Sequence, residues 1–126
     1  MIENQTVVIL GAAEVIGREL TAEAKKMYRH VYPITTISTD HLNAISKEKP
    51  LRIMGLDAES CVATFVLLAM RYGFKLILDG SEIREDRDDL AGKGDQSLRF
   101  SRIKLVQRSI AEMTLEFDWG SVEIIW

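Results

Sequence analysis

Cysteine, histidine and long hydrophobic runs are scarce in this sequence, and each scarcity excludes a class of protein. The 126 residues include one cysteine, Cys61, and two histidines, His30 and His41. A single cysteine excludes an intrachain disulfide framework and a zinc site built from several cysteines. The longest apolar run, residues 61–70, has ten residues, about half of what a membrane-spanning helix requires. We therefore expect no membrane partner.

Proline is also scarce, and neither sign of charge is in large excess. With two prolines and no Gly/Ser-rich stretch, the sequence indicates no linker, and we expect one domain over residues 1–126. Its 16 basic and 19 acidic residues give a net charge of −3, which argues against a dedicated nucleic-acid binder. No pattern typical of a secretory signal opens the chain, so we expect a cytoplasmic protein.

Apolar patterns typical of strands and helices alternate over residues 6–79. The expected strands are residues 6–10, 34–38, 51–55 and 75–78, and the expected helices are residues 12–31, 39–47 and 58–72. In the first helix the inward positions would be Ile16, Leu20, Ala24, Met27 and Val31. This alternation predicts an α/β fold of βαβαβαβ order, with a mainly parallel sheet flanked by helices.

The expected helix over residues 58–72 has almost no polar face. Asp57 is placed to be its N-cap, and Gly73 to be its left-handed C′ residue, with Phe74 making the accompanying hydrophobic contact. A helix that is apolar all round is either deeply buried or part of an interface. Two alternatives stay open: burial under the C-terminal segment, or contact with a second subunit.

The pattern changes after Gly80, which divides the chain into a βα half (residues 1–80), an acidic loop (81–97) and C-terminal strands (98–126). Residues 98–106 predict a strand. Residues 113–119 alternate apolar and polar side chains, as in a half-buried strand. Turn-forming residues and a further alternation up to Trp126 follow. The C-terminal third is therefore expected to be an antiparallel meander that ends in a hairpin.

Residues 7–20, VVILGAAEVIGREL, combine a strand, a glycine, small residues, a second glycine and an amphipathic helix. This segment resembles the opening βαβ unit of NAD(P)-binding Rossmann domains, and the resemblance extends over residues 6–80. Gly11 and Gly17 match the first and third glycines of the family's GAAGxIG-type loop. Asp40, after the second expected strand, matches its acidic ribose-binding residue.

The resemblance implies a cofactor site formed by Gly11, Ala12, Ala13, Gly17 and Asp40. The middle glycine, which lets the backbone approach the pyrophosphate, is replaced by Glu14, whose side chain obstructs and repels phosphates. If a nucleotide binds, we expect a mononucleotide such as an adenine nucleotide, or an atypical binding mode, rather than hydride transfer. The alternative is that no cofactor binds, with Gly11 ending a strand and Gly17 allowing close packing of helix on sheet.

A cluster of carboxylates follows the fourth expected strand. Asp79 lies at the carboxyl end of that strand, where ligands bind in open α/β sheets, and with Glu82 it is a candidate ligand for Mg²⁺. The cluster comprises Asp79, Glu82, Glu85, Asp86, Asp88 and Asp89. Because Arg84 and Arg87 interleave with the acids and the spacing matches no calcium loop, a solvated acidic loop is the favoured interpretation.

Charge is unevenly distributed in the second half of the chain. Residues 79–95 contain seven acidic and three basic residues, whereas residues 96–110 contain four basic and no acidic residues. The basic segment could meet nucleic acid or an acidic protein, but pairing of the two segments within a chain or across a dimer is the simpler interpretation. The candidate interface residues are Phe65, Met70, Arg99, Arg102, Trp119 and Trp126.

Cys61, His30 and His41 are weak candidates for chemistry. Cys61 lies on the apolar helix, where a thiol is usually an inert core residue. His30 would face the negative end of the first helix. His41 could act as a general base, but no serine or cysteine motif accompanies it, and a surface or capping role is favoured.

The leading hypothesis is a non-catalytic interaction or regulatory module that associates with itself and with another protein, without a cofactor. A reduced Rossmann-like nucleotide-binding protein is the first alternative. A metal-assisted enzyme centred on Asp79 is the second.

Overall fold

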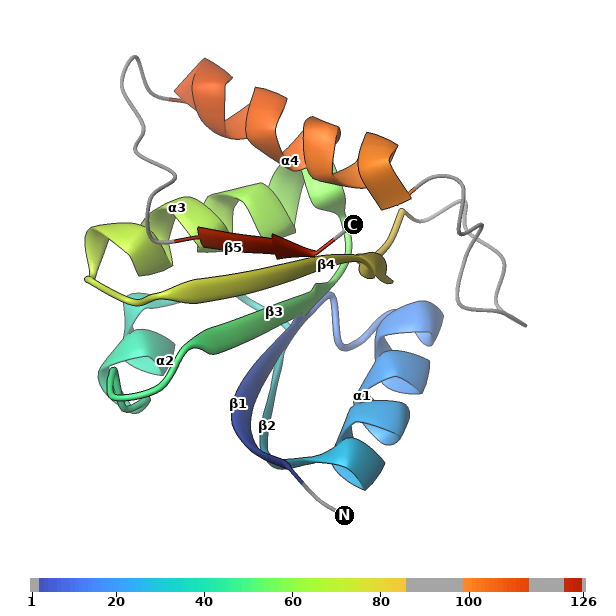
Figure 1. Cartoon of the computed structure of the whole chain (residues 1–126). Helices are drawn as coiled ribbons and strands as arrows, with labels where there is room; N and C mark the ends of the chain where they lie inside the picture. Colours follow the sequence, from blue (N-terminus) through green and yellow to red (C-terminus); the bar gives the residue numbers. More distant parts are fainter. Residues whose placement is uncertain (1–2, 86–98, 114–121, 126) are drawn as a thin grey trace.

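A computed structural model of the chain describes residues 3–85, 99–113 and 122–125. Strands and helices alternate along it (Figure 1). The elements are β1 (Glu3–Leu10), α1 (Val15–Met27), β2 (Tyr28–Ile34), α2 (Thr39–Asn43), β3 (Leu51–Gly55), the short π-helical segment η1 (Ala58–Val62), α3 (Ala63–Arg71), β4 (Leu76–Ile83), α4 (Arg99–Met113) and β5 (Val122–Ile125).

The described strands form one five-stranded sheet in the order β2-β1-β3-β4-β5, and every neighbouring pair is parallel. The predicted α/β class with a parallel sheet is thus confirmed. β2 and β3 flank β1 on opposite sides, so the winding reverses between β1 and β3. This order is one of the two common doubly wound arrangements, whereas dinucleotide-binding domains usually have the order 3-2-1-4-5-6. In both arrangements ligands bind beside the carboxyl ends of the strands at the reversal.

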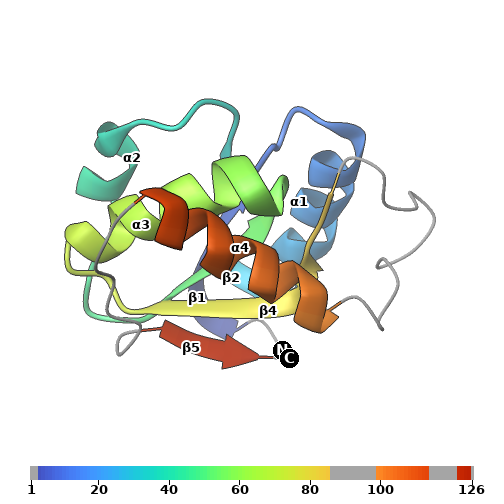
Figure 2. The same ribbon diagram turned by 90° about the horizontal axis from the view of Figure 1, so that it is seen from above.

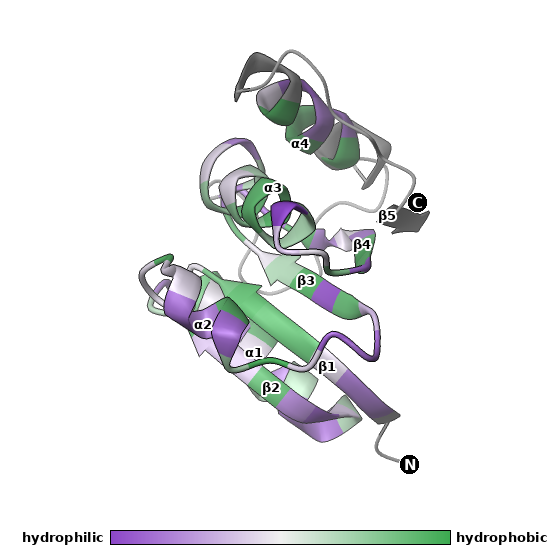
Figure 3. Ribbon diagram, turned by 90° about the vertical axis from the view of Figure 1, so that its left-hand side faces the viewer, coloured by the Kyte–Doolittle hydropathy of each residue, from purple (hydrophilic) through white to green (hydrophobic). Residues whose placement is uncertain are grey.

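Two hydrophobic clusters pack on opposite faces of the sheet. On one face α1 covers β1, β2 and β3, and this cluster comprises Val7, Ile9, Ile16, Leu20, Ala24, Tyr28, Met54 and Leu56. On the other face, side chains of α2, η1, α3 and α4 pack against the alternate strand residues, including Val8 and Leu10. Successive side chains of a strand point to opposite faces, which explains why β1 is apolar without interruption where it crosses the centre of the sheet (Figure 3).

The first helix is shorter than predicted. α1 ends at Met27 and β2 begins at Tyr28, so the strand predicted over residues 34–38 is wrong in position. The first three predicted inward positions are buried, whereas Met27 is 52% exposed and Val31 lies in β2. Tyr28 still donates its backbone N–H to the carbonyl of Ala24, but its backbone is extended (φ −125°, ψ 146°), which ends the helix, and its side chain is buried among the residues beneath α1.

The apolar segment forms the predicted helix as η1 followed by α3. Its C-terminus is confirmed: Gly73 has φ +87°, and the N–H groups of Gly73 and Phe74 donate to carbonyls of the last turn at 3.0 and 3.1 Å, as in a Schellman motif. Asp57 occupies the N-cap position, but its side chain makes no capping hydrogen bond there. The described helices include none that is long and apolar enough to cross a membrane.

Packing of α4 explains why the preceding helix is apolar. α4 lies along η1 and α3 over β4 (Figure 2). Ile103, Val106 and Ile110 of α4 are fully buried against this surface, as are Phe65 and Val66 of α3. Of the two predicted alternatives, burial under the C-terminal segment therefore accounts for the apolar helix without a second subunit.

The C-terminal segment is helical where the sequence predicts a strand. The strand predicted over residues 98–106 is wrong, because α4 occupies Arg99–Met113. Its buried residues Ile103, Val106 and Ile110 recur at helical spacing, and η1 and α3 supply the apolar surface that a helix needs. β5 is a strand as predicted, and it pairs in parallel with β4; the other arm of the predicted antiparallel hairpin lies outside the described residues. The strand predicted over residues 113–119 lies outside the described residues, apart from its first residue.

Candidate functional site

Three charged side chains meet between β3 and β4 on the α1 side of the sheet. Arg52 is in register with Val7 and Ile77, which places it on the face that α1 covers. Asp79 lies two residues beyond Ile77 on the same face. Nε of Arg52 donates to Oε1 of Glu82 at 2.8 Å, and Nη2 donates to Oδ2 of Asp79 at 3.3 Å. We call these three residues the Arg52 cluster.

The Arg52 cluster is shielded from water and internally hydrogen-bonded. The side chains of Arg52, Asp79 and Glu82 are 13%, 14% and 20% exposed. The other carboxylate oxygen of Asp79, Oδ1, accepts the backbone N–H of Ser81 at 2.9 Å and its hydroxyl at 2.7 Å. Buried charges are tolerated when they are paired and hydrogen-bonded in this way. The cluster therefore ties β3 to the carboxyl half of β4.

Burial and neighbouring charges act in opposite directions on these groups. Burial raises the pKa of Glu82 and the charge of Asp79 raises it further, while Arg52 and Arg84 lower it without cancelling the rise. For Arg52, burial by itself lowers the pKa, but attraction to Glu82, Tyr28 and Asp79 outweighs burial and the pKa is raised. Arg52 therefore stays charged, and Glu82 is the group whose proton affinity the fold has increased. Such groups beside a pocket are candidates for function.

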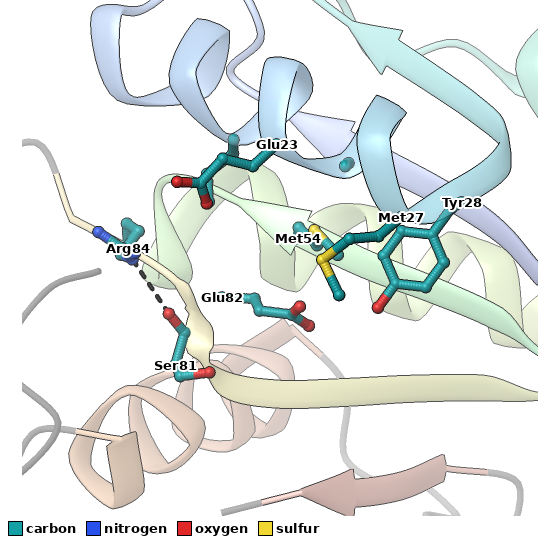
Figure 4. Close-up of a pocket in the computed structure, with 9 residues that line it drawn as sticks. Glu23, Met27, Tyr28, Met54, Ser81, Glu82 and Arg84 are labelled. Carbon is teal, nitrogen blue, oxygen red and sulfur yellow. Dashed lines mark hydrogen bonds between the residues drawn. The ribbon is translucent and has the colours of Figure 1, made fainter. Parts of the chain in front are cut away.

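A pocket of about 140 Å³ opens beside the cluster, between α1 and β4 (Figure 4). Figure 4 shows the Glu82 carboxylate directed from β4 toward Met27 and Tyr28. Arg84 is 3% exposed and forms part of the pocket wall, where its Nε donates to the carbonyl of Ser81 at 3.1 Å. The lining residues are Leu20, Glu23, Ala24, Met27, Tyr28, Met54, Ser81, Glu82 and Arg84. The pocket thus combines an apolar floor with carboxylates.

β4 includes the start of the predicted acidic loop. The strand extends to Ile83, so the predicted metal ligands Asp79 and Glu82 lie in the sheet and are paired with Arg52. Within the described part of the chain, no group of three or more His, Cys, Asp or Glu residues could hold a metal ion. The predicted carboxylates at positions 86, 88 and 89 lie outside the described residues. A divalent cation at Asp79 would have to displace the Arg52 guanidinium.

The glycine loop after β1 lies at the reversal point of the sheet, next to β3. A Cβ at Gly17 would lie 2.0 Å from the carbonyl oxygen of Gly11, and a Cβ at Gly11 would lie 2.7 Å from that of Leu56. Both contacts are too short for a side chain, so packing alone requires both glycines. Glu14 is exposed at the N-cap of α1 and makes no side-chain capping hydrogen bond.

The other residues of the predicted cofactor site are spread over two elements. Ala12 is buried and Ala13 is exposed in the loop after β1. Asp40 is exposed in the first turn of α2, where its backbone N–H donates to the Ser38 hydroxyl at 3.2 Å. Nε2 of His41, in the same helix, lies 3.1 Å from the backbone carbonyl oxygen of Thr36, in the segment that precedes α2.

The predicted interface residues do not form one surface among the described residues. Phe65 is fully buried in the core, and Met70 is half-buried. Arg99 and Arg102 lie on α4, of whose first turn only the backbone is described. The two candidate tryptophans, at positions 119 and 126, lie outside the described residues.

Two further residues are placed differently from the prediction. Cys61 is exposed on η1 rather than inert in the core. His30 is exposed on β2, at the edge of the sheet, rather than in the last turn of the first helix. The correction for His30 follows from the earlier end of α1, which places this residue in the strand.

Sequence reasoning missed Arg52 and Tyr28. Arg52 could have been found, because it is the one charged residue in the otherwise apolar strand LRIMG, and a charge in a buried strand requires a partner. Tyr28 could not have been found, because the first helix was predicted to continue beyond it.

Comparisons with protein-family models, with curated proteins and with solved structures find no match to this chain.

Proposed function

We propose that the chain is a non-catalytic protein-interaction module that associates with a second copy of itself through the α1 side of its sheet. One observation carries this proposal. Sheets made only of parallel strands are normally covered by helices on both faces. On this side α1 is the one described helix that packs on the sheet, and it covers β1, β2 and β3 (Figure 1).

Over β4, the described residues place the Arg52 cluster and the pocket on the α1 side, and none of their helices covers this strand there. Met27 lines this pocket and is 52% exposed. In a two-fold dimer the same patch on both copies is used, so each Met27 would be covered by the other copy. Burying the exposed half of a methionine side chain contributes about 1 kcal/mol, and it occurs twice in a symmetric dimer.

The polar contacts of the described residues support an interaction role over catalysis. No serine, threonine or cysteine among these residues shares a hydrogen bond with a histidine, as activation of a nucleophile requires. The buried charges of the Arg52 cluster pair with one another. Such pairing fixes the position of strands and of the pocket wall.

Sedimentation equilibrium of two matched variants tests the proposal. Met27 and Val15 are each 52% exposed and lie near opposite ends of α1, but only Met27 lines the pocket. Met27→Glu would place a charge in the interface and weaken self-association about tenfold or more. Val15→Glu would leave it unchanged. A monomeric wild-type chain, or equal effects of the two variants, would contradict the proposal.

Nucleotide binding is a second candidate, favoured by one observation. The glycine loop after β1 lies at the reversal point of the sheet, where ligands of doubly wound proteins bind. Thermal-shift titration with ATP and NAD tests this candidate, and Glu14→Gly is the informative variant because it removes the side chain that repels phosphates. A ligand-dependent rise in Tm that increases in Glu14→Gly would support nucleotide binding. If millimolar ligand changes the Tm of neither protein, nucleotide binding is ruled out as a function.

A further inference from the structure

We propose that the pocket between α1 and β4 binds a primary alkylammonium group, the chemistry shared by a lysine side chain and a free aliphatic amine. The inference goes beyond self-association, because it assigns to the pocket a ligand chemistry that does not require a second copy of the chain. Its support comes from the shape of the pocket, its charge and the direction of one carboxylate.

The pocket has the size and surface for a short alkyl chain. α1 contributes Leu20, Ala24 and Met27, and β3 contributes Met54. Its volume of about 140 Å³ is close to that of an apolar cavity of about 150 Å³ that admits benzene. Methionine side chains adapt to an irregular guest, which suits a flexible methylene chain.

The charges around the pocket leave one negative charge in excess. Two carboxylates, Glu23 and Glu82, line it, and Asp79 lies behind Glu82 in the Arg52 cluster. Two guanidiniums, Arg52 and Arg84, oppose these three carboxylates. A guest with one positive charge therefore neutralises the group, whereas an anion would add to the excess.

The direction of the Glu82 side chain places a hydrogen-bond acceptor at the pocket. Figure 4 shows its carboxylate in the gap between β4 and Met27. Oε1 accepts from Arg52 at 2.8 Å, and a carboxylate has about four acceptor positions, so it can accept further bonds. An ammonium group carries three donors and no acceptor, which matches a site that offers the acceptor oxygens of Glu82 and Glu23 beside the hydroxyl groups of Tyr28 and Ser81.

Titration of the full chain with n-butylammonium, followed by amide chemical shifts, tests the inference. Saturable shifts are expected at Ala24, Met27 and Met54, with a Kd on the order of millimolar for so small a ligand. Uncharged 1-butanol should bind more weakly, and butyrate should not bind. Equal binding of butylammonium and 1-butanol, or shifts confined to other parts of the chain, would overturn the inference.

Three substitutions to glutamine separate the roles of the carboxylates. Glu82→Gln should weaken butylammonium binding at least tenfold, because a buried hydrogen bond to a charged group is lost. Glu23→Gln, at an exposed position, should weaken it about threefold without disturbing the fold. Glu19→Gln, one turn away on α1 and outside the pocket lining, should have no effect. Unchanged binding in both pocket variants would overturn the inference.

Sedimentation in the presence of butylammonium distinguishes the source of the ammonium group. If a lysine of the second copy fills the pocket, butylammonium will compete with it and lower the measured mass. If the second copy covers Met27 without entering the pocket and free amines are the ligands, binding will leave the mass unchanged. Amine binding by a chain that remains monomeric at all concentrations would support this inference while contradicting self-association.

Discussion

Removal of Arg52 should be among the most destabilising single substitutions in this chain. Arg52→Met leaves Asp79 and Glu82 in their shielded positions without the cation that pairs with both, and only the charge of Arg84 still favours the ionised form of Glu82. Breaking a buried ion pair from one side typically costs about 3–5 kcal/mol. Because the three side chains are still 13%, 14% and 20% exposed, we expect the free energy of unfolding to fall by somewhat less, about 2–4 kcal/mol at neutral pH.

Urea unfolding measures this loss directly, through the midpoint at constant m-value. For a chain of 126 residues, about 4 °C per kcal/mol gives a fall in Tm of roughly 8–16 °C. Arg29→Met is the matched control, since Arg29 is an exposed arginine on a neighbouring part of the sheet, and its effect should stay within about 0.5 kcal/mol.

Neutralising the whole cluster should restore stability. Arg52→Met combined with Glu82→Met and Asp79→Asn removes all three charges, and the amide oxygen of the introduced asparagine can still accept both hydrogen bonds from Ser81. More than half of the loss should be recovered, because well-packed neutral residues commonly replace a buried ion pair at little cost. An Arg52→Met protein within about 0.5 kcal/mol of wild type, or a triple variant weaker than the single one, would refute the reasoning.

Three further predictions concern the charge of Glu82, the glycine loop and α4. Because the pKa of Glu82 is raised by burial, the folded chain binds its proton more tightly than the unfolded chain. This contribution to stability is complete below the ordinary pKa of 4.5 and is lost as the pH rises through the folded value. Urea unfolding across pH should therefore show that wild type loses stability relative to Glu82→Gln as the pH rises. The opposite slope would contradict the environment assigned to Glu82. The charged or titratable groups of that environment are Arg52, Asp79, Arg84, Glu23 and Tyr28. Gly17→Ala should lower the free energy of unfolding by about 3 kcal/mol, because the added Cβ is overpacked against Gly11. Gly73→Ala has no atom within 4 Å of its added Cβ, so it should cost only the roughly 1–2 kcal/mol of a left-handed alanine. Equal losses in thermal unfolding would count against the close packing of Gly17 on Gly11. Ile103→Ala should cost roughly 3 kcal/mol because its side chain is fully buried, while exposed Arg108→Ala should change little; similar unfolding midpoints would be inconsistent with docking of α4.

The strands β1 and β3 were predictable because they carry their own signals, whereas β2 was not. The uninterrupted apolar run of β1 and the sequence LRIMG of β3 each match a strand buried on both faces. The end of α3 was predictable for a similar local reason, since only a glycine adopts the φ of Gly73 without strain.

The errors arose where tertiary packing decides between two local patterns. Residues 98–106 contain β-branched and aromatic residues, but Ile103 and Val106 also share a helical face, and the apolar surface of η1 and α3 favours the helix. At Tyr28 the helical spacing continues in the sequence, yet burial of its ring beneath α1 ends the helix. The Arg52 cluster depends on both effects, because it needs the register of β3 with β4 and the extension of β4 to Glu82.

Sedimentation equilibrium of the wild-type chain tests the central claim most directly. At concentrations from about ten to several hundred micromolar, the range in which small interfaces associate, the measured mass should rise from 14.3 kDa toward twice that value. The mass of the Met27→Glu chain should rise from 14.3 kDa only at concentrations about tenfold higher or more. A wild-type mass of 14.3 kDa at every concentration would contradict self-association through the α1 side of the sheet.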